Sequence, residues 1–332
     1  MWWIRGWDFP RIQIATLSII TLCLSVFVHH DLWYQWLINT LLACSLIWQL
    51  YKIVPFTFLY KKQVISTKTT DPDRQISIIV ANVLMTNTQT KLLSDLVKEM
   101  KPDLLLTLET DTKWQQALQP LEEMMPHVVQ CPQDNLYGMH LYSRLELVDP
   151  KINFVIEDGV PSIHTGVILP SGEKITLHCL HPAPPSPTEN RLSSERDAEL
   201  ITVGREIKKH QAATIATGDL NDVAWSDTTL LFRKISGLLD PRIGRGMFNS
   251  FHADHYCLRW PLDHLFHSND FTATKLQRLC NIGSDHFPLY CQLQYAPRAT
   301  SQQEAPTADS DDKEWAKQKV TNGKKNPSDP NA

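Results

Sequence analysis

Polar residues follow four segments that have the composition of buried strands. "SIIVAN" ends at Asn82, "LLLTLE" ends at Glu109, "TLHCLH" ends at His181, and "TIATGDLND" carries Asp219 and Asn221. Any one of these residues has an ordinary structural explanation, because Asn and Asp often cap helices or begin turns. Strands that end at one edge would instead bring these amides, carboxylates and the imidazole together. Such a group is costly to hold in a fold unless it binds something charged.

Two later motifs add side chains of the same kinds. "PLDHLF" supplies Asp263, and "IGSDHFPL" supplies Asp285 beside His286. A surface turn would also accept an acid next to a histidine, so the second motif says little by itself. Together with the strand-end residues, the two motifs predict a site for a charged ligand.

The segments between these motifs predict a layered α/β domain. Residues 75–83 and 102–110 have the apolar runs of buried strands, and residues 90–100 have the apolar spacing of a helix. This strand–helix–strand unit is the building block of α/β folds. Further strands are expected at residues 138–144, 152–157, 164–170, 174–181, 213–220, 262–268 and 288–295, and a helix at about 189–209. Their hairpin-like spacing favours mixed or antiparallel sheets.

Residues 1–62 have the composition of a membrane anchor. Two apolar runs lie at about 12–29 and 32–51, and the second carries Trp33, Tyr34, Trp36 and Trp48 toward its ends. A bilayer takes about 20 apolar residues per helix, and aromatic residues favour its borders. The runs therefore predict a two-helix transmembrane hairpin that contacts the lipid bilayer through residues 12–51. A cleaved signal peptide followed by a buried helix is the alternative, but no small-residue cleavage pattern follows the first run.

Basic residues predict the orientation of this anchor. Lys and Arg flank the outer ends of the two runs, whereas the turn between them has neither. The positive-inside rule then places both termini and the following domain in the cytoplasm. An extracytoplasmic domain stays open, because only a few charges carry the argument.

The rest of the chain changes composition twice. Residues 63–74 predict a polar linker, residues 75–296 have the apolar content of a folded domain, and residues 297–332 predict a disordered tail. The folded part carries a net negative charge, which is an awkward field for a protein that binds duplex DNA through its backbone. The 7 cysteines have no paired spacing, which indicates free thiols and a reducing compartment.

The order of the motifs resembles the endonuclease/exonuclease/phosphatase superfamily. Asn82, Glu109, His181 before a proline-rich loop, "GDLND", "PLDHLF" and "GSDHFPL" carry the resemblance, which covers about residues 75–295. It implies a four-layer α/β sandwich, in which two packed mixed or antiparallel sheets are flanked by helices. The N-terminal part is similar to a membrane-anchored bacterial branch, which implies a multi-pass protein of the bacterial inner membrane.

The resemblance also implies a metal site. Asn82, Glu109 and Asp285 would lie near one ion, and such hard oxygen ligands suit Mg²⁺, with Mn²⁺ as an alternative. No other cofactor is expected.

The same resemblance implies roles for the remaining residues. Asp219 would orient and deprotonate the attacking water, and Asn221 would hold water or phosphate. His286 and Asp263 would form a dyad in which the carboxylate fixes the imidazole tautomer and the ring contacts the scissile phosphate. His181 would donate a hydrogen bond to a second non-bridging oxygen.

Two departures from the family pattern bear on the substrate. Leu108 stands where many members have Gln, and His181 stands where abasic-site endonucleases have Tyr, which is more similar to the lipid- and mononucleotide-directed branches. We expect a monomeric, membrane-anchored, Mg²⁺-dependent phosphodiesterase or phosphatase that acts on nucleic acid or a phospholipid headgroup. The alternative is a catalytically inactive membrane-bound scaffold of the same fold, which is expected to have lost the acidic residues. The sequence identifies no protein partner.

Overall fold

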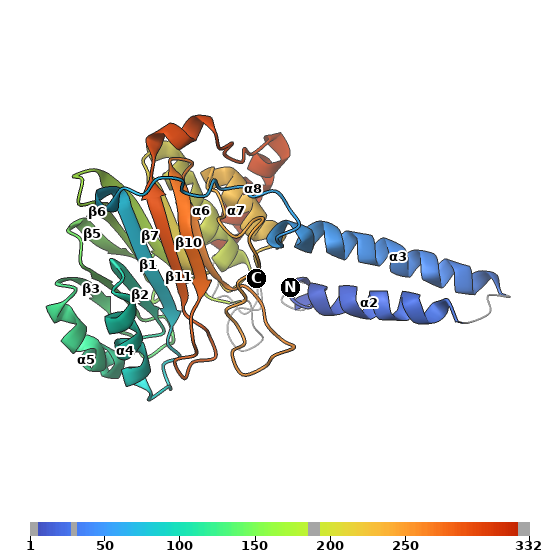
Figure 1. Cartoon of the computed structure of the whole chain (residues 1–332), viewed down its shortest axis with the longest axis horizontal. Coiled ribbons are helices and arrows are strands. Elements are labelled where there is room, and N and C mark those ends of the chain that lie inside the picture. The colour runs from blue at the N-terminus through green and yellow to red at the C-terminus, as the bar shows by residue number, and fades with distance from the viewer. Residues whose placement is uncertain (1–5, 28–31, 185–192, 325–332) are drawn as a thin grey trace.

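Two β-sheets pack face to face and carry helices on their outer faces (Figure 1). The computed structural model describes residues 6–27, 32–184 and 193–324. The strand order is β10-β11-β1-β2-β4-β3 in the six-stranded sheet, called sheet A, and β5-β6-β7-β8-β9 in the five-stranded sheet, called sheet B. The predicted four-layer α/β sandwich is therefore confirmed.

The elements have the following bounds. Sheet A contains β1 (Gln75–Asn82), β2 (Leu104–Leu108), β3 (His127–Cys131), β4 (Met139–Ser143), β10 (Phe271–Arg278) and β11 (Leu289–Tyr295). Sheet B contains β5 (Leu147–Asn153), β6 (Ser162–Ile168), β7 (Lys174–Leu180), β8 (Thr214–Asp219) and β9 (Asp263–His267). The α-helices are α2 (Arg11–Ser25), α3 (Trp33–Ile53), α4 (Thr90–Met100), α5 (Thr112–Leu118), α6 (Ser194–His210), α7 (Asp227–Ser236) and α8 (Ser310–Lys324). The 3₁₀ turns are η1 (Gly6–Asp8), η2 (Val54–Phe56), η3 (Pro72–Arg74), η4 (Gln119–Glu123) and η5 (Pro297–Ser301).

Three hydrophobic layers hold this sandwich together. The largest lies between the sheets, where Ile78 and Leu106 of sheet A share one cluster with Leu177 of sheet B. A second layer joins sheet A to α4 and α5, and a third joins sheet B to α6 and α7. Because alternate strand residues face opposite sides of a sheet, continuous apolar runs such as "SIIVA" serve two of these layers at once.

Each sheet contains one pair of parallel strands, and these pairs set the position of the strand-end residues. In sheet A, β1 and β2 run parallel with Asn82 paired to Leu108; in sheet B, β7 and β8 run parallel with Leu180 paired to Gly218. Gly218 has φ +143°, and a Cβ there would lie 1.9 Å from the carbonyl oxygen of Leu180. Only glycine therefore allows β7 and β8 to approach so closely just before Asp219.

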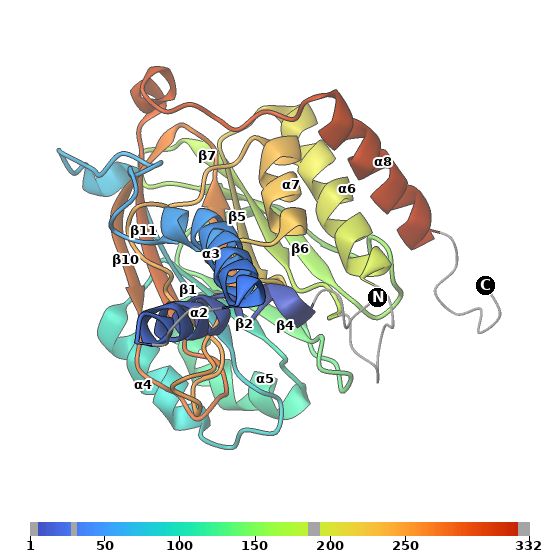
Figure 2. The same cartoon turned by 90° about the vertical axis from the view of Figure 1, so that its right-hand side faces the viewer.

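The N-terminal helices α2 and α3 lie side by side and project away from the domain (Figures 1 and 2). Helix α3, extended to Phe56, is long and apolar enough to cross a membrane, whereas α2 has 15 residues. At 1.5 Å per residue α2 is about 22 Å long, which is shorter than a bilayer core of about 30 Å. The predicted pair of spans at 12–29 and 32–51 is thus supported for one helix only. Residues 28–31, the predicted turn, lie outside the described residues.

The bases of these two helices are packed into the domain. Ala15, Ile53 and Phe56 share a buried cluster with Trp225, and Lys52 lies 2.6 Å from Asp227. The predicted linker at 63–74 is also packed, since Val64 is fully buried and the backbone around residue 66 bridges to β10. Although the segment is polar overall, it contains Val64 and Ile65, and its backbone pairs with β10 at the edge of sheet A.

The prediction of a disordered tail at 297–332 is wrong for residues 297–324. Helix α8 packs on α6 and α7, with Ala316 in a cluster with Ile201 and Leu231. Lys319 donates hydrogen bonds to Asp197 and Thr228, and its ammonium lies 4.5 Å from the centre of the Trp315 ring. The low apolar content is misleading here, because small residues and one buried ion pair make the contact.

We predict that Gly323→Leu destabilises the protein. A Cβ at Gly323 would lie 2.3 Å from the Ala198 Cβ and 2.5 Å from the Ser194 carbonyl oxygen of α6. Overpacking of this kind costs about 1–3 kcal/mol in unfolding free energy, measurable by chemical denaturation. The control is Asn322→Leu at the exposed neighbouring position. Equal stability of the two variants would show that α8 does not pack on α6.

Candidate active site

The strand ends bring acids from both sheets to one place. Asn82 ends β1, Glu109 follows β2, and Asp219 ends β8. The Nδ2 group of Asn82 donates to Glu109 Oε1 at 2.7 Å and to Asp219 Oδ2 at 3.2 Å. Glu109 has φ +60°, so the chain turns sharply where β2 ends. One amide therefore joins a carboxylate of sheet A to a carboxylate of sheet B.

The orientation of the Asn82 amide is fixed by the backbone. The N–H of Leu84 donates to Asn82 Oδ1 at 3.1 Å, which identifies the oxygen and leaves the nitrogen to face the two acids. Asn82 thus presents donors to the acid cluster, whereas the predicted role as a metal ligand requires its oxygen.

His286 and Asp263 form a buried pair beside Asp219. The Nδ1 atom of His286 lies 2.7 Å from Asp263 Oδ2, and its Nε2 atom lies 3.6 Å from Asp219 Oδ2. Asp263 begins β9, directly opposite Asp219 in the antiparallel pairing with β8. The hydrogen bond to Asp263 fixes the ring, so the other nitrogen points to Asp219.

The chain around Asp285 is bound to the end of β1. The hydroxyl of Ser284 donates to the Asn82 carbonyl oxygen at 2.8 Å and accepts from the His286 N–H at 3.0 Å. The negative charge of Asp285 is close enough to act on the pKa of Glu109. Gly283 has φ +86°, a conformation that glycine adopts without strain. The motif "IGSDHFPL" is therefore a shaped loop with Ser284 at its centre.

Asn221 and His181 lie at the same edge with different environments. The N–H of Asn221 donates to Asp219 Oδ1 at 2.9 Å, and its Nδ2 group donates to the Pro182 carbonyl oxygen at 3.0 Å. His181 is buried with its ring centre 5.5 Å from that of Tyr137, and its Nδ1 atom has no hydrogen-bond partner among the described residues. Asn221 thus connects Asp219 to the loop at Pro182, whereas the Nδ1 atom of His181 is available to a ligand.

Burial and charge shift the pKa values at this site. Burial raises the pKa of Asp219 to about 7, although the His286 charge opposes the rise. Burial also raises the pKa of Glu109, and the hydrogen bond from Asn82 lowers it. For His286, burial favours the neutral ring, but the charges of Asp263 and Asp219 prevail and raise the pKa to about 10. His286 is therefore an imidazolium at neutral pH.

The donor set fits a divalent metal ion. Asp219, Asp263 and His286 have ligand atoms within 4.8 Å of one another, but a protonated His286 that is held by Asp263 has no lone pair to offer. Glu109 and Asp285, which are partly exposed, are the remaining oxygen donors. Burial raises the pKa of Glu109, and hard oxygen ligands of this kind suit Mg²⁺.

Sequence reasoning missed the buried charges beneath the "GDLND" loop. Arg196 of α6 donates to the Asn221 carbonyl oxygen at 2.7 Å and lies 3.1 Å from Asp222. His264 Nε2 lies 2.8 Å from the Asp222 carbonyl oxygen, and Arg242 lies 2.6 Å from His264 Nδ1. His264 is thus a positioning residue. The sequence around Arg196 looks like an exposed helix start, so only the three-dimensional contacts identify it.

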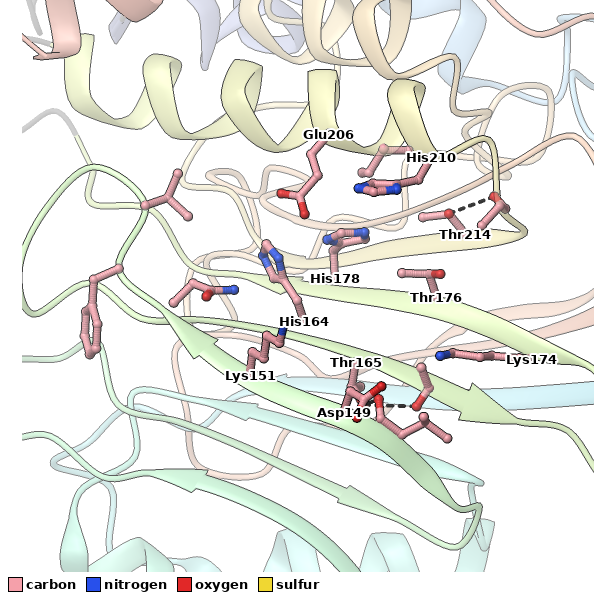
Figure 3. Close-up of a pocket in the computed structure, with 17 residues that line it drawn as sticks. Asp149, Lys151, His164, Thr165, Lys174, Thr176, His178, Glu206, His210 and Thr214 are labelled. Carbon is pink, nitrogen blue, oxygen red and sulfur yellow. Dashed lines mark hydrogen bonds between the residues drawn. The ribbon is translucent and has the colours of Figure 1, made fainter.

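Two cavities are lined by residues other than the predicted site residues. One of about 660 Å³ is lined by Ile12 and Leu17 of α2 together with Arg259 and Arg278. Another, of about 840 Å³, opens on the outer face of sheet B, and none of the predicted site residues line it (Figure 3).

A family model described as the endonuclease/exonuclease/phosphatase family matches residues 79–286, which is more than half of the chain. No curated protein sequence matches it.

Several solved structures share the fold. The human Nocturnin catalytic domain with bound sulfate anion has a TM-score of 0.56 and 17% identity, covering 73% of this chain and 99% of that one. A D. rerio TDP2 humanized by 14 mutations has a TM-score of 0.55 and 18% identity, covering 67% and 99%. An endonuclease/exonuclease/phosphatase from Beutenbergia cavernae has a TM-score of 0.53 and 12% identity, covering 67% and 72%.

We predict that Asp263→Asn lowers the pKa of His286 below its value of about 10. The substitution removes a negative charge that stabilises the imidazolium, so the ring loses its proton at lower pH. Titration of the His286 ring by NMR measures the shift. The control is Asp254→Asn, an exposed acid that should leave the titration unchanged. An unchanged pKa in Asp263→Asn would contradict the assignment of the pair.

Proposed function

This chain belongs to the endonuclease/exonuclease/phosphatase family and is a phosphoester hydrolase, and we propose that it is a membrane-anchored, Mg²⁺-dependent phosphodiesterase or phosphatase. The observation that carries the proposal is the continuous hydrogen-bonded series from Glu109 through Asn82 to Asp219, with the His286–Asp263 pair beside it. This series offers acids, a base and a cation within one buried edge, as in-line attack of water on a phosphoester requires.

Glu109 and Asp285 are the residues that would hold the metal ion. When bound, Mg²⁺ supplies positive charge to the phosphoryl oxygens. Asn82 donates to Glu109 at 2.7 Å, so its role in the proposal is to orient that carboxylate.

Asp219 is the proposed general base. Burial raises its pKa to about 7, which suits a group that takes a proton from water near neutral pH. Its Oδ1 atom accepts from the backbone N–H of Asn221, which leaves Oδ2 toward Asn82 and His286. Asn221, with its amide bound to Pro182, positions Asp219 through the backbone.

His286 is the proposed cationic donor to the scissile phosphate. Its Nδ1–H is held by Asp263, and its Nε2–H, which lies 3.6 Å from Asp219 Oδ2, would donate to a phosphate oxygen when substrate binds. His181 lies buried nearby and would donate to a second non-bridging oxygen. Burial lowers the pKa of His181 to about 4, so this second ring is a neutral donor.

Exposed apolar side chains support the membrane anchor. Trp33, Trp36 and Leu41 of α3 and Leu17 and Leu24 of α2 are each more than 40% exposed. Exposing so many large apolar side chains is costly in water and is typical of a segment that contacts lipid. Helix α3 supplies the span, and α2 lies beside it.

The cavity beside α2 favours a phospholipid headgroup over nucleic acid. The guanidinium groups of Arg259 and Arg278 lie 5.0 and 4.4 Å from the centre of the Phe287 ring. Phe287 follows His286 directly. A phosphate bound to these guanidinium groups would lie beside the apolar side chains of α2 that line the same cavity.

We predict metal-dependent turnover that depends on the named residues. Full-length protein in detergent with Mg²⁺ would be assayed on phospholipid vesicles, plasmid DNA, abasic duplex and RNA. Asp219→Asn and His286→Gln should each lower kcat by about 10²–10⁴, and Glu109→Gln should raise the Mg²⁺ concentration needed for half-maximal rate. Asp254→Asn and His127→Ala are the control variants.

The outcomes separate the alternatives. Turnover of lipid but not of DNA or RNA supports the headgroup, and the reverse supports nucleic acid. Absence of metal-dependent turnover on every phosphoester would favour the non-catalytic scaffold. Full activity of Asp219→Asn and His286→Gln would overturn the site while leaving the enzyme class in place.

We predict that the chain behaves as an integral membrane protein with its domain in the cytoplasm. It should stay with the membrane through high salt and alkaline carbonate and leave it only in detergent. Replacing Leu41 and Ile47 of α3 by Arg should release it, because charge at the centre of a span is costly. A reporter fused after Ala332 that is active only outside the cytoplasm would contradict the orientation.

A further inference from the structure

The outer face of sheet B is only partly covered by helices. Helix α6 packs over β7 and β8, and residues of β5 to β7 line a cavity beside it. A cavity of about 840 Å³ lies there, between the C-terminal half of α6 and strands β5 to β7. Five side chains with carboxylate or imidazole groups line this cavity, and apart from Asp149 of β5 they are two from β6 and β7 and two from the helix (Figure 3).

The two strand residues are a cross-strand pair of histidines. His164 of β6 is paired with His178 of β7, so both rings stand on the same face of the sheet. The ring centres are 4.5 Å apart and the planes meet at 69°. His178 is 4% exposed. Its Nδ1 atom and the Nε2 atom of His164 are buried and have no hydrogen-bond partner among the described residues.

The two helix residues face this pair from the opposite side. Glu206 and His210 are four positions apart on α6, which places them on one side of the helix. Both are exposed, and both point from the helix toward the two histidines of the sheet (Figure 3). Two neighbouring residues on a helix and a cross-strand pair thus approach one space from separate elements.

We propose that His164, His178, Glu206 and His210 form a second metal site, which takes Zn²⁺ or a similar transition-metal ion. Three imidazole nitrogens and one carboxylate oxygen are a donor set that zinc prefers, whereas Mg²⁺ takes oxygen ligands. The orphaned nitrogens of the strand pair are the observation that points to a ligand, because buried polar atoms normally have a partner.

Binding requires the helix residues to turn inward. Among the described residues only Asp219, Asp263 and His286 already have ligand atoms within 4.8 Å of one another, so the four groups on the outer face surround the space without closing on it. The strand pair is held by the sheet, and the two exposed side chains of α6 are the ones that rotate. The ion would connect the C-terminal end of α6 to β6 and β7 and so stabilise the fold.

The test measures zinc on the full-length chain in detergent with millimolar Mg²⁺ present, so that the proposed oxygen site is filled. After desalting, elemental analysis should give one Zn²⁺ per chain, and Co²⁺ in its place should give the visible absorption of a tetrahedral ion. Glu206→Ala with His210→Ala, both at exposed positions, should weaken Zn²⁺ binding by more than about tenfold. His178→Ala should do the same, and His127→Ala is the control.

The readouts keep this site apart from the proposed active site. The double variant on α6 should keep Mg²⁺-dependent turnover and lose the Zn²⁺-induced rise in Tm that the parent chain shows. The second site would be overturned if the parent chain bound no Zn²⁺ in the presence of millimolar Mg²⁺. It would also be overturned if the double variant bound Zn²⁺ as tightly as the parent chain. Neither result bears on the proposed hydrolase activity.

Discussion

The amide of Asn82 connects the two sheets at the edge where the chemistry is proposed, and the rest of the arrangement depends on it. Its two donors reach Glu109 from sheet A and Asp219 from sheet B, at 2.7 and 3.2 Å. Such spacing requires that one parallel strand pair in each sheet ends at the same edge. The apolar core between the sheets fixes that relation. The packing of the sandwich therefore serves the site directly, because a small rotation of one sheet would break one of the two bonds.

The site holds more negative charge than its own cation compensates. Glu109, Asp219, Asp263 and Asp285 lie around a single imidazolium at His286. Burial raises the pKa of Asp219 and of Glu109, so ionisation of these two groups lowers the free energy of unfolding. A divalent cation would offset that cost. The same imbalance that weakens the fold locally is what makes the edge suited to hold a metal ion beside a phosphate.

The sequence allowed some of these features to be predicted and hid others for physical reasons. Polar residues at strand ends could be placed together because parallel strands align their carboxyl ends, as β1 and β2 do for Asn82 and Glu109, and β7 and β8 for His181 and Asp219. The direction of the Asn82 amide could not, since it depends on the backbone N–H of Leu84. Helix α8 was hidden because its contacts use Ala316 and Gly323, which add little to apolar composition. Helix α2 is apolar like α3, but its 15 residues are too few for a span, and the apolar run in the sequence did not show where that helix ends.

The anchor and the site are joined by packed contacts, which constrains how substrate can approach. Gln13 of α2 donates to the Cys257 carbonyl oxygen at 2.6 Å, and the same loop carries Phe251, whose ring centre lies 4.9 Å from that of His286. Trp225 and Phe56 pack at the base of the helices. A flexible tether would only raise the concentration of the domain near a bilayer. Contacts of this kind hold the edge at a fixed angle to the proposed anchor, so a phosphoester at the lipid surface meets His286 from one direction.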